Sequence, residues 1–176
     1  GYFSAGDGKS TVDRVDYSND TAAAAAKGPL TENLENMGPV SSTTHGYFAG
    51  GTAGWPNHRS TVQRIDYSND TATAVARGPL SSTRGSGLAG MSPRDYGMPT
   101  ENIVNYAAGT LATPNTGYFG GGNGPLATVD RIDYSNDTAT AVAKGPLSAS
   151  RYRLAATGNA SFGYFGGGKT PSVVST

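Results

Sequence analysis

Two short motifs alternate along the chain, and their spacing constrains its fold more than any other feature. Gly-Tyr-Phe begins at Gly1, Gly46, Gly117 and Gly163, and Asp-Tyr-Ser-Asn-Asp begins at Asp16, Asp66 and Asp133. The step from Asp16 to Gly46 is 30 residues, and so is the step from Asp133 to Gly163. Self-similarity of this kind indicates a repeat protein, in which each unit buries its faces against its neighbours.

The motifs divide the chain into one repeat array. The same step from Asp66 predicts a unit start at residue 96, only 21 residues before Gly117, so this unit is expected to be degenerate. The expected units are residues 1–45, 46–95, 96–116 (degenerate) and 117–162, with the start of another at 163–176. Because the array begins and ends inside a unit, we expect a fragment of a longer protein.

The unit from Gly117 to Phe162 predicts four short strands separated by turn residues. The expected strands are Gly117–Gly122, Thr128–Tyr134, Thr138–Lys144 and Arg151–Thr157. β-Branched and aromatic residues favour a pleated surface, and Ser, Asn, Asp, Gly and Pro between them favour turns. The sequence therefore predicts an all-β protein built from four-stranded antiparallel sheets.

Glycine and charge suggest where each strand lies within its sheet. Double glycines after the Gly-Tyr-Phe strand are expected where neighbouring sheets crowd together, since a residue without a side chain permits a close approach or a bulge. The charged group Asp130, Arg131 and Asp133 is expected on a more peripheral strand.

Composition indicates a thinly packed but folded chain. Only 26 of the 176 residues are Leu, Ile, Val or Phe, a fraction that by itself suggests disorder. Disordered chains also carry high net charge and few aromatics, whereas this chain has zero net charge, 10 Tyr and 5 Phe. We therefore expect close stacking of Ala and Gly faces, with Tyr, Phe and Leu filling the gaps.

The order of an aromatic strand, a double glycine, a Tyr-containing strand and an Asn/Asp turn resembles the kelch repeat. The kelch Trp after that turn is missing, because Thr-Ala-Thr-Ala-Val-Ala stands there. The segments GYFGGG and STVDRIDYSNDTATA also resemble repeats of structural and tail-fibre proteins of marine bacteriophages. These resemblances imply blades of a kelch-like β-propeller, either a partial propeller or one completed by assembly.

The Asp-Tyr-Ser-Asn-Asp motif is interpreted as a hydrogen-bonded turn, since Asn and Asp bond their own local backbone. The residues assigned to this structural role are Asp16, Asn19, Asp20, Asp66, Asn69, Asp70, Asp133, Asn136 and Asp137. A calcium loop is the alternative, because oxygen-bearing residues stand at its positions one, three and five. The Gly and Glu that such a loop needs further on are absent, so no metal is expected.

Asn-X-Ser/Thr glycosylation signals overlap these turns. They occur at Asn19, Asn69, Asn136 and Asn159. Turn formation explains Asn and Thr there equally well, so glycosylation is left open.

The loop Gly51–Arg59 breaks the regularity and holds the only Trp. Trp55, His58 and Arg59 are candidate ligand-binding residues, because they could stack on a sugar ring and bond its hydroxyls. A tolerated surface insertion is the alternative. His45 and His58 are the only histidines, and neither stands at metal or triad spacing from a carboxylate cluster. No catalytic residue and no cofactor is predicted, so the chain is expected not to be an enzyme.

Charge and hydropathy limit the classes of partner that the chain is expected to bind. Lys and Arg together number 13, as do Asp and Glu, so nothing favours nucleic acid, and no apolar run is long enough for membrane insertion. Self-association or further blades of a longer chain are expected, with glycans or virion proteins as candidate partners. Two functions follow: a structural or adhesive part of an extracellular or virion assembly, or a propeller scaffold of a glycan-processing enzyme.

Overall fold

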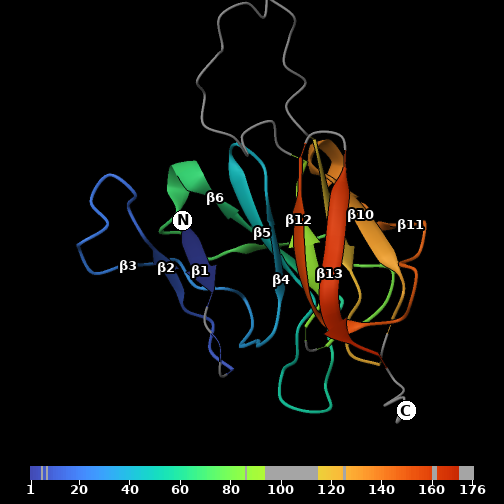
Figure 1. The fold of residues 1–176 in the computed structure, drawn as a ribbon. Coiled ribbons are helices and arrows are strands. Elements are labelled where there is room, and N and C mark those ends of the chain that lie inside the picture. Colours follow the sequence, from blue (N-terminus) through green and yellow to red (C-terminus); the bar gives the residue numbers. More distant parts are fainter. Residues whose placement is uncertain are drawn as a thin grey trace, which may run out of the picture.

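The structure is a computed structural model that describes residues 1–4, 6, 8–85, 87–93, 115–124, 126–159 and 162–170. It is an all-β chain of successive antiparallel sheets, as the sequence predicted (Figure 1). The expected unit at 96–116 lies almost entirely outside the described residues. No closed ring of sheets is formed by the part of the chain that the structure describes.

The second and third sheets are complete and have the same topology. The second contains β4 (Gly38–Ser41), β5 (His45–Ala49), β6 (Val62–Asp66) and β7 (Val75–Arg77), paired in that order. The third contains β8 (Ala89–Met91), β9 (Thr116–Gly120), β10 (Val129–Asp133) and β11 (Val142–Lys144), also in chain order. The four-stranded antiparallel sheets predicted from the repeat are therefore confirmed.

The first and fourth sheets are incomplete in opposite ways. The first contains β1 (Tyr2–Ser4), β2 (Val12–Arg14) and β3 (Ala25–Lys27), which correspond to the last three strands of a complete sheet. The fourth contains β12 (Tyr152–Gly158) and β13 (Gly163–Lys169), which correspond to the first two. The Gly-Tyr-Phe strand is thus present at both ends of the array.

The sheets cross the expected unit boundaries by one strand. The segment expected as the fourth strand of a unit instead pairs with the Gly-Tyr-Phe strand of the following unit, as β4 does with β5 and β12 with β13. The connection explains the shift. Only Ser42–Thr44 separate β4 from β5, which suits an antiparallel hairpin. The segment between β3 and β4 instead carries the chain to the next sheet.

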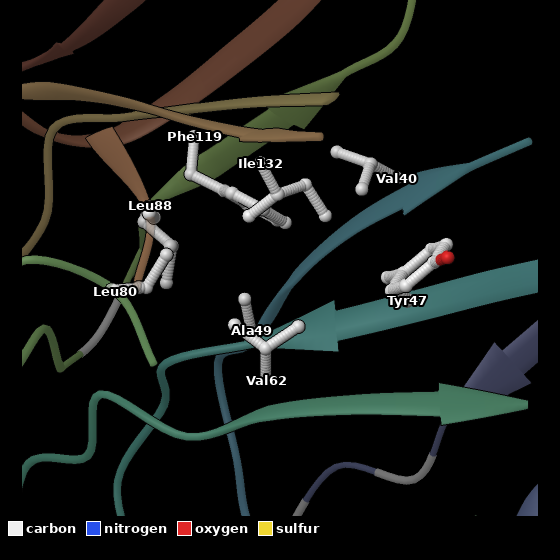
Figure 2. Close-up of a cluster of buried hydrophobic side chains, with 9 residues drawn as sticks. Val40, Tyr47, Ala49, Val62, Leu80, Leu88, Phe119 and Ile132 are labelled. Carbon is white, nitrogen blue, oxygen red and sulfur yellow. The ribbon is translucent and has the colours of Figure 1, made fainter. Parts of the chain in front are cut away.

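The core lies between neighbouring sheets. Val40, Tyr47, Ala49 and Val62 of the second sheet face Phe119 and Ile132 of the third, with Leu80 and Leu88 beside them (Figure 2). A smaller cluster joins the first and second sheets through Val12, Leu30, Phe48, Ile65 and Ala74. Among the described residues, the second sheet thus buries apolar side chains against both of its neighbours, as expected for a repeat array.

The double glycines act as predicted, whereas one member of the charged group does not. Gly51 and Gly122 have φ angles of 97° and 131°, a region that side chains disfavour. Asp130, expected on a peripheral strand, is 0% exposed on β10, between β9 and β11. Its burial is possible because it pairs with Arg84, which lies in the segment between β7 and β8.

Candidate functional site

The first Asp of each Asp-Tyr-Ser-Asn-Asp motif makes hydrogen bonds within its own turn. In the second sheet, Asp66 caps the 3-10 helix η1 (Tyr67–Asn69), and its Oδ1 accepts bonds from Ser68 N at 2.9 Å and Ser68 Oγ at 2.7 Å. Asp133 caps η2 (Tyr134–Asn136) in the same way, and Asp16 accepts the same two bonds from Ser18. These bonds lower the pKa values of Asp16, Asp66 and Asp133, since they favour the ionised carboxyl.

The turn asparagines are exposed and also make local bonds. Oδ1 of each accepts a bond from the Thr hydroxyl two residues later, as in the pairs Asn19–Thr21, Asn69–Thr71 and Asn136–Thr138. Asn159 Oδ1 accepts from the backbone N–H of Phe162 at 2.8 Å. These are the local bonds of a turn, and the glycosylation of the four asparagines stays a prediction.

The last Asp of the motif acts differently from the prediction, because it binds the preceding sheet rather than its own turn. Asp137 Oδ2 accepts a bond from Tyr47 Oη at 3.1 Å and from Arg64 Nη1 at 2.7 Å, and it lies 3.4 Å from Arg77 Nε. These three partners lie on β5, β6 and β7. A single carboxylate therefore joins the third sheet to three strands of the second.

Asp70 repeats this arrangement one sheet earlier. It accepts bonds from Tyr2 Oη at 2.8 Å and Arg14 Nη1 at 2.7 Å, and Lys27 Nζ lies 3.2 Å away. Burial alone would raise the pKa of Asp70, but the bonds from Tyr2 and Lys27 and the charge of Arg14 lower it overall. Burial beside Asp137 raises the pKa of the Tyr47 hydroxyl, so it stays protonated and donates.

The tyrosine of the same motif stacks on the preceding sheet. Tyr67 stacks on Tyr2 with ring centroids 4.8 Å apart, and Tyr134 stacks on Tyr47 at 4.9 Å. The interplanar angles are 12° and 18°. The second and third motifs thus each present a ring and a carboxylate to the Gly-Tyr-Phe tyrosine of the preceding sheet.

The backbone completes the contact at the Gly-Pro segment that follows the last strand of each sheet. Gly28 N donates to Asp70 O at 2.9 Å, and Gly78 N donates to Asp137 O at 2.7 Å. Ala74 N donates to Pro29 O and Ala141 N to Pro79 O, at 2.9 and 2.8 Å. We call the carboxylate, the stacked ring and these backbone bonds together the inter-sheet joint.

Glycine is required where the joint brings two backbones together. A Cβ added at Gly78 would collide with the carbonyl of Ala139, whereas one added at Gly145, the equivalent position of the third sheet, would meet nothing within 4 Å. We expect Gly78→Ala to lower the free energy of unfolding by about 1–3 kcal/mol, the usual cost of overpacking. Gly145→Ala is the matched control and should leave urea-induced unfolding nearly unchanged. Equal losses in the two variants would contradict this account of the glycine.

A buried ion pair lies at the joint between the second and third sheets. Arg84 and Asp130 are both 0% exposed, with Nη2 and Oδ2 2.8 Å apart. Arg84 Nη1 donates to the carbonyls of Phe119, Gly121 and Thr128, and Asp130 accepts from the N–H and hydroxyl of Ser81. At the previous joint, Leu34 and Gln63 occupy the same two positions. Gln63 there accepts from Thr31 as Asp130 does from Ser81.

The partners of Asp70 and Asp137 were not predicted from the sequence, although they recur at equivalent positions of the repeat. Tyr2, Arg14 and Lys27 recur as Tyr47, Arg64 and Arg77 at the same places in their units. They stand far from the Asp that they bind, since Tyr47 and Asp137 are 90 residues apart.

The candidate ligand loop brings together two of its three predicted residues. Trp55 is 72% exposed, and the His58 ring meets it edge-on with centroids 5.4 Å apart. Arg59 instead pairs with Glu32 at 2.9 Å between Nε and Oε2. Within the described residues, no three His, Asp or Glu side chains converge as metal ligands would, and no helix is long and apolar enough to span a membrane.

Comparisons with known proteins add no relative. A scan against protein-family models finds no match, and a search of the curated proteins finds none.

Proposed function

We propose that the chain is a non-catalytic structural and adhesive repeat protein of an extracellular assembly, a phage virion or tail-fibre component. Its sheets serve as blades of a kelch-like β-propeller, and its loops contact host glycans or other virion proteins. The observation that carries the proposal is the recurrence of one inter-sheet joint with the same residue types at each step. The carboxylates of Asp70 and Asp137 each pair with an arginine of the preceding sheet, and such contacts between sheets stabilise an array.

The Trp55 loop is the part of the molecule that best fits the adhesive role. An exposed indole beside an imidazole offers a flat apolar face with a polar edge, which suits a sugar ring. Because the loop interrupts only one unit, this function would be confined to one sheet of the array. The remaining sheets would then supply its support.

A glycan array with the purified chain tests the proposal. We expect binding without release of sugar, and at least a tenfold loss of affinity in Trp55→Ala, which corresponds to about 1.4 kcal/mol. Phe3→Ala is the matched control, because Phe3 is 60% exposed on another sheet. Release of sugar would support the enzyme-scaffold alternative, and equal binding by the wild type and Trp55→Ala would remove the loop from the proposal.

A further inference from the structure

The inter-sheet joint is formed twice in the described residues. One half of it is the Asp and Tyr of the motif, and the other half is the Tyr and the cations of the preceding sheet. Each half also occurs once without the other. Asp20 and Tyr17 of the first sheet correspond to Asp137 and Tyr134. Tyr17 is 78% exposed, and Asp20 makes no hydrogen bond or ion pair with any described residue. We call Asp13, Tyr17, Asp20 and Ala24 the knob.

The third sheet carries the other half without its partner. Tyr118, Arg131 and Lys144 correspond to Tyr47, Arg64 and Arg77. Among residues whose placement is described, no ring stacks on Tyr118 and no carboxylate pairs with Arg131 or Lys144. Their equivalents in the second sheet have both kinds of partner. We call Tyr118, Arg131, Lys144, Gly145 and Arg151 the socket.

Glycine supports the same pairing. Gly28 and Gly78 are needed because the next sheet's backbone lies against them. Gly145 stands in the same Gly-Pro-Leu segment, but only open space surrounds its Cβ position. The third sheet therefore has the residue that a docked neighbour requires, at a position where its own fold does not require it.

Charge complementarity points to the identity of the neighbour. Arg151 corresponds to Arg84 and donates to Gly167 O as Arg84 does to Gly121 O, but no carboxylate pairs with it in the described part of the chain. Arg84 is paired with Asp130 of the following sheet. The knob has Asp13 at the position of Asp130, and Asp13 is exposed. Each open cation of the socket thus has a matching open carboxylate on the knob.

Two cavities lie where the incomplete sheets lack strands. One of about 400 Å³ is lined by Tyr118, Lys144, Pro146 and Phe165, beside the socket. The other, of about 530 Å³, is lined by Tyr2 and Phe3 of β1 and by Pro39 and Val40 of β4. In the second and third sheets, β4 and β8 occupy the position beside the Gly-Tyr-Phe strand that is empty beside β1.

We infer that the socket binds the knob of a second copy of this chain, so that copies associate head to tail. Asp20 of one copy then pairs with Arg131 and Lys144 of the other, Tyr17 stacks on Tyr118, and Asp13 meets Arg151. Strands β1, β2 and β3 of the second copy complete the sheet that β12 begins. Since β1 and β13 are both Gly-Tyr-Phe strands, β1 takes the place of β13, whose side chains are almost all exposed.

This inference rests on the proposed function and names the partner in the assembly. Its test is sedimentation velocity of the 176-residue chain over a range of concentrations. We expect the wild type to associate reversibly, and Asp20→Arg and Arg131→Glu each to weaken association at least tenfold. An equimolar mixture of these two variants should associate again, because one keeps the knob and the other keeps the socket.

Controls separate loss of docking from loss of folding. Lys9→Glu reverses an exposed charge outside the knob and the socket and should associate like the wild type. At concentrations where the wild type is monomeric, Gly145→Val should keep its unfolding midpoint, since a Cβ there meets nothing within 4 Å, but at higher concentrations the variant should not associate. A monomeric wild type, or association that is equal in all these variants, would overturn the inference. The glycan array is read independently, so either proposal can fail alone.

Discussion

Asp130→Ala is expected to lower the free energy of unfolding by about 3–5 kcal/mol, because removing one partner of a buried ion pair leaves the other charge uncompensated. Arg84 would keep its carbonyl partners but lose the only carboxylate near it in the described structure. Arg84→Leu should cost a similar amount, since Asp130 would then be buried without its cation. Urea-induced unfolding followed by tyrosine fluorescence measures both losses.

The chain supplies its own control for this prediction. Leu34 and Gln63 occupy the two positions at the preceding joint and are both 0% exposed. The double variant Arg84→Leu/Asp130→Gln copies that joint and should recover most of the stability lost in either single variant, since replacing a whole buried ion pair is often neutral. Additive losses in the double variant would show that the two side chains do not act as a pair.

Asp137→Ala is expected to lower the free energy of unfolding by about 2–3 kcal/mol, from charged hydrogen bonds to the second sheet. Its partners Arg64 and Arg77 have side chains 22% and 18% exposed, so solvent compensates them in part and the loss is smaller than for Asp130. The loss should appear as weaker coupling between the second and third sheets. Hydrogen exchange of β5 and β9 amides measures that coupling directly.

Asp133→Ala is the matched control, since it removes a carboxylate from the same motif. Asp133 bonds Ser135 and Asn115 within its own sheet, so only about 1 kcal/mol should be lost, the usual cost of a missing cap. If Asp133→Ala cost as much as Asp137→Ala, the contacts of Asp137 with the preceding sheet would have no special role.

Local structure was predictable because short-range chemistry determines it. The expected strand Thr128–Tyr134 contains β10, and Arg151–Thr157 overlaps β12. The expected strand Thr138–Lys144 forms only over Val142–Lys144, because the preceding residues leave the sheet. Ala141 there bonds Pro79 of the neighbouring sheet instead.

Contacts between sheets were not predictable in the same way. Turn propensity accounts for Asp133, whose partner Ser135 is two residues away, but says nothing of Asp137, whose partner Arg64 is 73 residues away. The burial of Asp130 was equally hidden, since its cation, Arg84, comes from the segment between β7 and β8. Among the candidate ligand residues, the contact between Trp55 and His58 was predictable because both lie in one short loop. The Arg59–Glu32 pair was not, because the two residues are 27 positions apart.

The joint has a direction. In both joints the carboxylate belongs to the later sheet in the chain, and the cations that it binds belong to the earlier sheet. Two like faces would bring charge of the same sign together, so mirror-fashion pairing of chains is disfavoured. Such a contact is heterologous, and it generates either a closed ring or an open filament. With two complete sheets in each copy and two shared between them, a closed pair would hold six, within the roughly four to eight of known propellers. If copies associate through this joint, the rotation from one sheet to the next decides whether the assembly is a closed ring or a filament.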